Sequence, residues 1–226
     1  MLLFPRAPSQ SRKVSLPPLH PPFRLNLVES SLAQPVKNDE RLYRSAYPTL
    51  KNFRFLRRLG LRTIVSLVPR DLMTSDLISF CAQEGIAHLH FPVSGSQRPL
   101  DAGVNDDNGP CPTHALMANI LAIAINPERM PVLVHCVNGA NVTGLVVAIL
   151  RKLQHRPDAS YSEEFERFTK DHTSMSEDER KFVVAFGLPV ALPPSLPAWL
   201  WSDLTPFVTP QNFRDDDEVD LVGRDA

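Results

Sequence analysis

The residues best suited to chemistry lie together between positions 135 and 144, which read His-Cys-Val-Asn-Gly-Ala-Asn-Val-Thr-Gly. An apolar, β-branched run precedes them and a longer apolar run follows. A loop between a strand end and a helix N-terminus directs several backbone N–H groups into one bowl, with the positive end of the helix dipole behind it. Gly139 and Gly144 permit the tight curvature that such a bowl requires. The segment therefore predicts an anion site suited to phosphate.

Cys136 lies at the base of this predicted bowl. Donors that bind an anion also favour a thiolate, so we expect Cys136 to have a lowered pKa and to be a nucleophile near neutral pH. The alternative is an unreactive cysteine buried at a strand end, which is what we expect of Cys81 and Cys111. For Cys136, the flanking glycines, His135 and Thr143 favour the reactive role.

Strand and helix patterns alternate on both sides of the loop. Residues 131–135 are typical of a buried strand, and residues 143–154 of a helix that is apolar around most of its circumference. The same patterns predict strands at 42–44, 62–68 and 87–93 and helices at 50–59, 75–84 and 112–125. This alternation predicts an α/β domain whose central, mostly parallel sheet is flanked by helices.

Two polar helices are expected after residue 154. Ser160 with Glu163 fits a capping box at the start of the first, and Ser174 with Glu177 fits one at the start of the second.

Proline and charge mark the two ends of the 226-residue chain. Residues 1–22 contain six of the 22 prolines, and no acidic residue occurs before position 25, which predicts a disordered, basic tail. Residues 187–226 contain prolines among Trp199, Trp201 and Phe207, then an acidic end, and this segment is either a solvated tail or one that docks on a partner or on the domain itself. Residues 23–186 form the expected domain.

Composition excludes several classes of protein. A net charge of −1 gives no electrostatic case for binding nucleic acid. No apolar run is long enough to span a membrane or to serve as a signal peptide, and three cysteines do not make a disulfide framework. We therefore expect a cytoplasmic protein that binds neither nucleic acid nor membrane, and we expect no cofactor and no metal.

The loop resembles the signature of the cysteine-dependent protein-tyrosine and dual-specificity phosphatases, H-C-x-x-G-x-x-R-[ST]-G. His135, Cys136, Gly139, Thr143 and Gly144 fill five of its six fixed positions. The stretches 42–48, 91–99 and 151–154 resemble the fungal and plant atypical dual-specificity branch, which includes inositol pyrophosphate phosphatases. The resemblance implies a dual-specificity-phosphatase-like fold over residues 23–186.

The sixth position departs from the signature. There the family has an arginine that grips two phosphate oxygens and stabilises the transferring phosphoryl group, and this chain has Val142. An arginine in that role accelerates phosphoryl transfer in other enzymes by about 10³–10⁵, or roughly 4–7 kcal/mol. The other phosphate-binding positions carry no basic side chain either, since they are Val137, Asn138, Gly139, Ala140 and Asn141. We expect weak phosphate binding and strongly impaired catalysis.

The resemblance suggests further site residues. Arg98 lies in a stretch similar to the loop that arches over the phosphate, and it is the candidate replacement for the missing arginine or else a surface residue. Asp101, with Asp106 as an alternative, is the candidate acid for the leaving oxygen, although turn chemistry also explains both. Thr143 is expected to steady the cysteine thiolate, or else only to cap the helix. His135 is expected to brace the loop and not to act as a base.

Three functions remain open from the sequence. The first is a weak phosphatase that uses Cys136. The second is a non-catalytic pseudophosphatase that binds or assembles with other proteins. The third is a different cysteine-loop chemistry, such as the sulfur transfer of rhodanese-like domains. The resemblance favours the phosphatase branch, with a phosphorylated protein or an inositol (pyro)phosphate as ligand and with a complex of related subunits as a further expectation.

Overall fold

A five-stranded sheet forms the centre of the molecule in this computed structural model, which describes residues 18–28, 40–94, 105–106, 109–197 and 199–200. Its strands are arranged in the order β1 (Asn26–Leu27), β2 (Leu42–Ser45), β7 (Val132–Cys136), β3 (Thr63–Leu67) and β4 (Ala87–His90). β1 runs antiparallel to β2 and the other neighbours are parallel, so the predicted mostly parallel sheet is confirmed. β7, which leads into the cysteine loop, lies at the centre.

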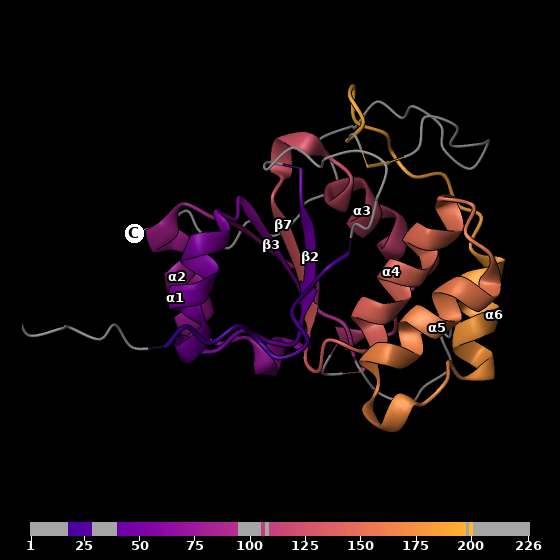
Figure 1. The fold of residues 1–226 in the computed structure, drawn as a ribbon, viewed down its shortest axis with the longest axis horizontal. Coiled ribbons are helices and arrows are strands. Elements are labelled where there is room, and N and C mark those ends of the chain that lie inside the picture. Colours follow the sequence, from indigo (N-terminus) through magenta and orange to yellow (C-terminus); the bar gives the residue numbers. More distant parts are fainter. Residues whose placement is uncertain (1–17, 29–39, 95–104, 107–108, 198, 201–226) are drawn as a thin grey trace, which may run out of the picture.

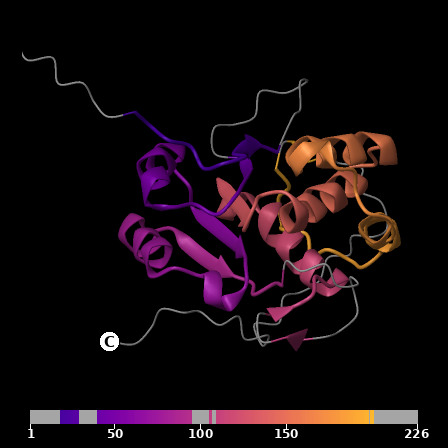
Figure 2. The same ribbon diagram turned by 90° about the horizontal axis from the view of Figure 1, so that it is seen from below.

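Helices cover both faces of this sheet (Figures 1 and 2). The face on one side carries α1 (Leu50–Leu59) and α2 (Ser75–Glu84), and each of these helices ends at a glycine in the left-handed conformation, as predicted. The other face carries α3 (His114–Ala124), α4 (Asn141–Leu153), α5 (Asp158–Phe168) and α6 (Glu177–Ala185). The remaining elements are the hairpin strands β5 (Asn105–Asp106) and β6 (Gly109–Pro110) and the 3₁₀ turns η1 (Arg70–Leu72), η2 (Pro127–Arg129) and η3 (Lys170–His172).

The side chains of β7 point alternately into two hydrophobic cores, one on each face of the sheet. Val132, Val134 and Cys136 belong to the larger cluster that α4 shares, whereas Leu133 belongs to the cluster beneath α1 and α2. Successive side chains of a strand point to opposite faces, so Cys136 and His135 lie on different sides of the sheet.

Neither of the two predicted capping boxes opens its helix. α6 is capped by Ser176 and Glu179, not by Ser174 and Glu177, because the Ser174 hydroxyl donates to Glu166. The first polar helix begins at Asp158 after Pro157, two residues before Ser160. A proline fixes the backbone φ and so favours a helix start beside it, which the Ser-x-x-Glu pattern does not take into account.

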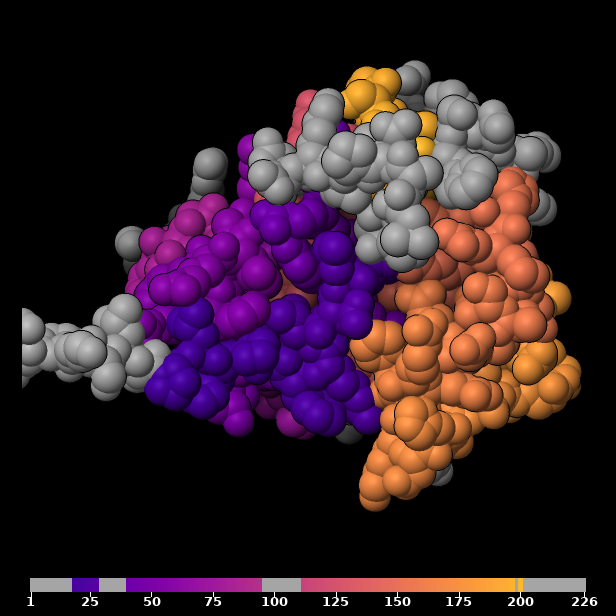
Figure 3. Space-filling model, viewed as in Figure 1, coloured from indigo at the N-terminus to yellow at the C-terminus, as the bar shows by residue number. Residues whose placement is uncertain are grey.

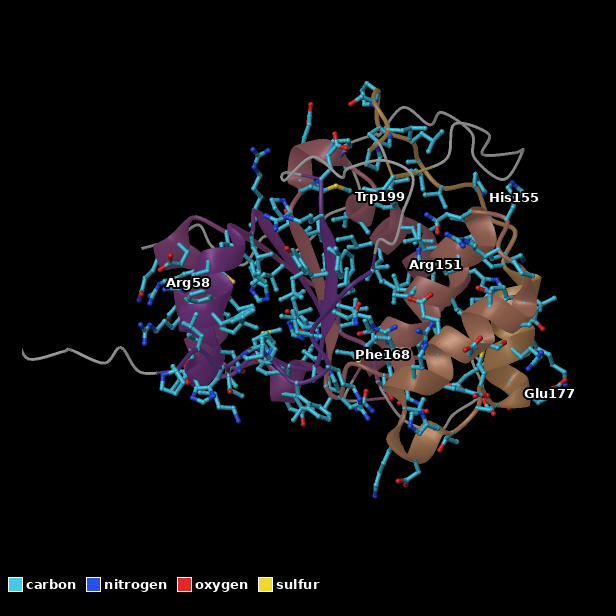
Figure 4. The ribbon with its side chains drawn as sticks, viewed as in Figure 1. Arg58, Arg151, His155, Phe168, Glu177 and Trp199 are labelled. Atoms are coloured by element: carbon cyan, nitrogen blue, oxygen red, sulfur yellow. The ribbon has the colours of Figure 1, made fainter. Side chains whose placement is uncertain are left out.

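The chain after residue 186 contributes to the larger core. Val190, Trp199 and Leu200 are buried in the cluster that includes α4, while Trp201, Phe207 and the acidic end lie outside the described residues. Figure 4 shows Trp199 and Phe168 toward opposite ends of the sheet. No helix in the described part of the chain is long and apolar enough to cross a membrane.

Candidate functional site

The cysteine loop joins the end of the central strand to the start of α4. Cys136 is the last residue of β7, is 3% exposed, and accepts a hydrogen bond at Sγ from the Gly139 N–H at 3.2 Å. Gly139 has φ 72°, and a Cβ there would lie 2.4 Å from the backbone N of Ala46. Only glycine allows both this conformation and this approach of the loop to the segment after β2.

Asn138 folds its side chain back into the loop. Its Oδ1 accepts a hydrogen bond from the Ala140 N–H at 2.8 Å and lies 3.4 Å from Cys136 Sγ, whose S–H donates to it. Its Nδ2 donates to Oδ1 of Asn141 at 3.0 Å. The carboxamide oxygen of Asn138 therefore bonds to the Ala140 N–H, which is one of the backbone donors that the sequence predicts for an anion.

Arg44 of β2 supports the loop from inside the protein. The residue is 1% exposed, and its guanidinium donates from Nη2 to the Gly139 carbonyl at 3.0 Å and stacks 3.8 Å over the ring of Phe168. Burial lowers the pKa of Arg44 to about 10, and the charges of Glu164 and Cys136 partly oppose this shift, so the group stays cationic at neutral pH. Nε and Nη1 of Arg44 have no hydrogen-bond partner in the described part of the chain. A buried cation thus lies beneath the loop.

His135 lies under the loop on the opposite face of the sheet. Its Nε2 shares a hydrogen bond of 2.7 Å with Ser66 Oγ, which in turn lies 2.8 Å from Nε2 of His88. Its Nδ1 lies 3.4 Å from the Cys136 carbonyl, and complete burial lowers the pKa of His135 to about 3. A neutral, fully buried imidazole of this kind braces the strand end and does not act as a base near pH 7.

A cavity of about 530 Å³ opens beside the loop. Its walls combine apolar, hydroxyl, amide and charged side chains from the N-terminal segment, the loop and the α5–α6 connection: Arg24, Ser94, Pro112, Asn138, Ala140, Asn141, Val142, Leu145, Phe165, Thr169, Lys170, Thr173, Ser174, Ser176, Asp178 and Glu179. Figure 3 shows the indigo N-terminal segment meeting the orange α5–η3 region on one face of the molecule. Among the described residues of this wall, Arg24 and Lys170 are positive, and Asp178 and Glu179 are negative.

The structure brings some predicted site residues together and does not describe others. Val142 is 6% exposed and lines the cavity where the resemblance implies an arginine. Val137 is 47% exposed. Arg98 and Asp101 lie outside the described residues, and so does the side chain of Asp106.

Thr143 does not cap α4, contrary to one of the two expectations for it. The N-cap residue is Ala140, and the helix begins two residues before Thr143. The Thr143 hydroxyl is fully buried and has no hydrogen-bond partner within the described ranges, so its other expected role, steadying the thiolate, remains a prediction.

Residues 31–205 match the model of a family described as the tyrosine phosphatase family. The chain belongs to the tyrosine phosphatase family. It is 34% identical over 128 residues to the inositol diphosphatase SIW14 of Saccharomyces cerevisiae, which spans 56% of this chain and 42% of SIW14. A putative tyrosine-protein phosphatase OCA1 from Kluyveromyces lactis is 36% identical over 151 residues, or 67% of this chain and 68% of OCA1.

Solved structures of SIW14 agree with the fold. The SIW14 catalytic core superposes with a TM-score of 0.60 at 26% identity, covering 75% of this chain and 88% of that chain. The predicted phosphatase-like α/β fold is confirmed. Because this chain spans less than half of SIW14, the activity of the whole relative does not transfer with the fold.

Sequence reasoning missed two arginines of this tyrosine phosphatase loop. Arg24 Nη1 donates to the Asn138 carbonyl at 2.8 Å from 114 residues away, and Arg44 reaches Gly139 from 95 residues away. A signal for Arg44 was present, since it lies inside the stretch 42–48 that resembles the family. For Arg24 the sequence showed only a positive charge near the border between the predicted tail and the predicted domain.

Proposed function

We propose that this chain binds a phosphoryl anion at the Cys136 loop and hydrolyses phosphate esters at most slowly. In the reaction that its family implies, Cys136 Sγ bonds to phosphorus while the bond to the leaving oxygen breaks. That oxygen takes a proton from an acid, for which Asp101 is the candidate, and water then cleaves the S–P bond. Of the groups that this reaction needs, the chain has Cys136 and the backbone N–H groups of the loop.

The observation that carries the proposal is the side chain of Val142 in the cavity wall. It offers neither charge nor donor to a phosphoryl group at the point where the family signature has its guanidinium. Loss of a contribution of about 10³–10⁵ in rate leaves the binding bowl but little of the acceleration. We therefore expect slow turnover.

The alternative is a pseudophosphatase that binds or assembles without catalysis. The carboxamide of Asn138 favours it, because Oδ1 already occupies the Ala140 N–H and the Cys136 S–H. An incoming phosphoryl oxygen must displace this group first. A complex with related subunits is the assembly role that fits this alternative.

The charge of the cavity bears on the ligand. Relatives are named inositol diphosphatases and tyrosine-protein phosphatases, so an inositol (pyro)phosphate and a phosphorylated protein are the two candidate classes. Among the described residues, two positive and two negative side chains line the cavity. Such a balance suits a ligand that presents one phosphoryl group better than a polyphosphate, because the carboxylates repel additional negative charge.

Two measurements test the proposal. Turnover of an aryl phosphate by the wild type should be slow but should vanish in Cys136→Ser, and inorganic phosphate should slow the alkylation of Cys136. Peptide-resolved mass spectrometry separates Cys136 from Cys81 and Cys111, which are buried as well. Protection by phosphate without any turnover supports the pseudophosphatase. Absence of both turnover and protection refutes an anion site at this loop.

A further inference from the structure

Arg24 lies far from the loop in the sequence, but its positively charged side chain contacts the loop in the structure. Its Nη1 donates to the Asn138 carbonyl at 2.8 Å, and its side chain lines the same cavity as Val142 and Asn141. A guanidinium has five N–H groups, and the bond to Asn138 uses one of them. Arg24 therefore brings a permanent positive charge to the wall from which the signature arginine is missing.

The local backbone holds Arg24 in this place. Arg24 has φ 55°, a left-handed conformation that costs a non-glycine residue of order 1 kcal/mol and persists only where neighbouring contacts impose it. Those contacts are the bond from the Ala46 N–H to the Phe23 carbonyl at 2.8 Å and the pairing of Asn26 with Arg44 between β1 and β2. The guanidinium also lies 4.7 Å from the centre of the Phe23 ring. The side chain is thus directed to the loop by a fixed segment.

We propose that Arg24 takes over the phosphate-gripping role that the family signature gives to an arginine at position 142. This inference rests on the proposed function, since it names the cation for the anion that the Cys136 loop binds. Lys170 also lines the cavity, but Arg24 is bonded to the loop backbone itself. A planar guanidinium at the rim supplies charge-assisted hydrogen bonds to a phosphoryl oxygen that the loop side chains lack.

The test compares Arg24→Gln with the wild type and with a control arginine. Gln keeps an N–H for the Asn138 carbonyl but removes the charge. The dissociation constant of inorganic phosphate, measured by its protection of Cys136 against alkylation and by calorimetry, should rise at least about tenfold in Arg24→Gln. Arg57→Gln should leave it unchanged, because Arg57 is an exposed residue of α1 that pairs with Glu84 at 2.7 Å. Melting curves confirm that each variant is folded.

A second pair of variants tests whether Arg24 and position 142 share one role. In a Val142→Arg background the effect of Arg24→Gln should fall below about threefold, because coupled residues do not act additively. Arg24→Lys keeps the charge but loses the planar fork, so its dissociation constant should lie between those of the wild type and Arg24→Gln. Equal effects of Arg24→Gln in both backgrounds, or a loss in Arg24→Lys as large as in Arg24→Gln, would overturn the inference.

The outcomes separate this inference from the proposed function. Phosphate that binds the wild type and Arg24→Gln equally well means that the backbone donors alone hold the anion, so the inference fails and the proposed function stands. Phosphate that does not protect Cys136 even in the wild type means that the proposed function fails as well.

Discussion

At the scale of single residues, we expect Val142 to limit how fast the Cys136 loop hydrolyses phosphate esters. We expect Val142→Arg to raise aryl phosphate hydrolysis at least about tenfold, since it restores a bidentate donor for the transferring group. Val142 borders a cavity of about 530 Å³, so the longer side chain has room to extend. Initial rates and melting temperatures are the measurements, because overpacking costs about 1–3 kcal/mol where room is lacking.

The control for this gain is the double variant Val142→Arg with Cys136→Ser, which should be inactive. A stable Val142→Arg variant with neither faster hydrolysis nor tighter vanadate binding would mean that the loop has left catalytic geometry. That result would favour the pseudophosphatase.

On the same loop, we expect the side chain of Asn138 to compete with the ligand. We expect Asn138→Ala to tighten phosphate binding about threefold to tenfold, because the Ala140 N–H no longer bonds to the carboxamide at 2.8 Å and meets the anion directly. Calorimetry against inorganic phosphate measures the effect. Asn126→Ala is the matched control, since that side chain accepts from Glu128 N at the start of η2, away from the loop. Weaker binding in Asn138→Ala would show that the side chain braces the bowl and does not block it.

At the scale of elements, the close contact of α4 with α5 sets the position of the loop. A Cβ on Gly144 would lie 2.6 Å from the Phe165 ring of α5, and Phe165 is 3% exposed. Gly144→Ala should therefore lower the free energy of unfolding by about 1–3 kcal/mol, measured by denaturant titration. Adding Phe165→Leu should recover part of this loss, because the smaller side chain makes room. If the double variant loses as much free energy of unfolding as the two single variants together, the two residues do not interact, which would contradict the contact.

The sequence predicted the elements better than it predicted their ends. The cysteine loop between β7 and α4 followed from apolar runs on either side of two glycines. The start of α6 did not, because Ser174 and Ser176 each stand three residues before a glutamate and only the contact of Ser174 with Glu166 separates them. Arg24 was beyond pattern reasoning, because it reaches the loop from a distant part of the chain, whereas Arg44 lies in the stretch 42–48 that resembles the family.

At the scale of the whole molecule, we expect the buried His135 to make stability depend on pH. Burial lowers the pKa of His135 to about 3 from an ordinary value of 6.5, so the unfolded chain binds its proton first as the pH falls. The stabilising contribution is complete above about pH 6.5 and is lost progressively between pH 6.5 and about 3. At pH 5 the loss amounts to about 2 kcal/mol for this group alone.

Denaturant titrations at pH 7.5 and pH 5 measure this dependence. The decrease in stability between them should shrink by about 2 kcal/mol in His135→Gln, whereas the exposed His172→Gln should keep the wild-type decrease. Identical decreases in all three proteins would rule out His135 as the source.

The segment after α6 packs into the larger hydrophobic core, so we expect its Trp199 to contribute to stability. Trp199 is 3% exposed and packs in the same cluster as Val190 and Leu200, so its truncation leaves a cavity in the larger core. Trp199→Ala should lower the free energy of unfolding by about 3–5 kcal/mol, measured by denaturant titration of the full chain. Val184→Ala on α6 is the control, because Val184 is 56% exposed and its change should stay within about 0.5 kcal/mol. Unchanged stability in Trp199→Ala would instead mean that this tryptophan serves a partner, which is the other role that its proline-rich setting predicts.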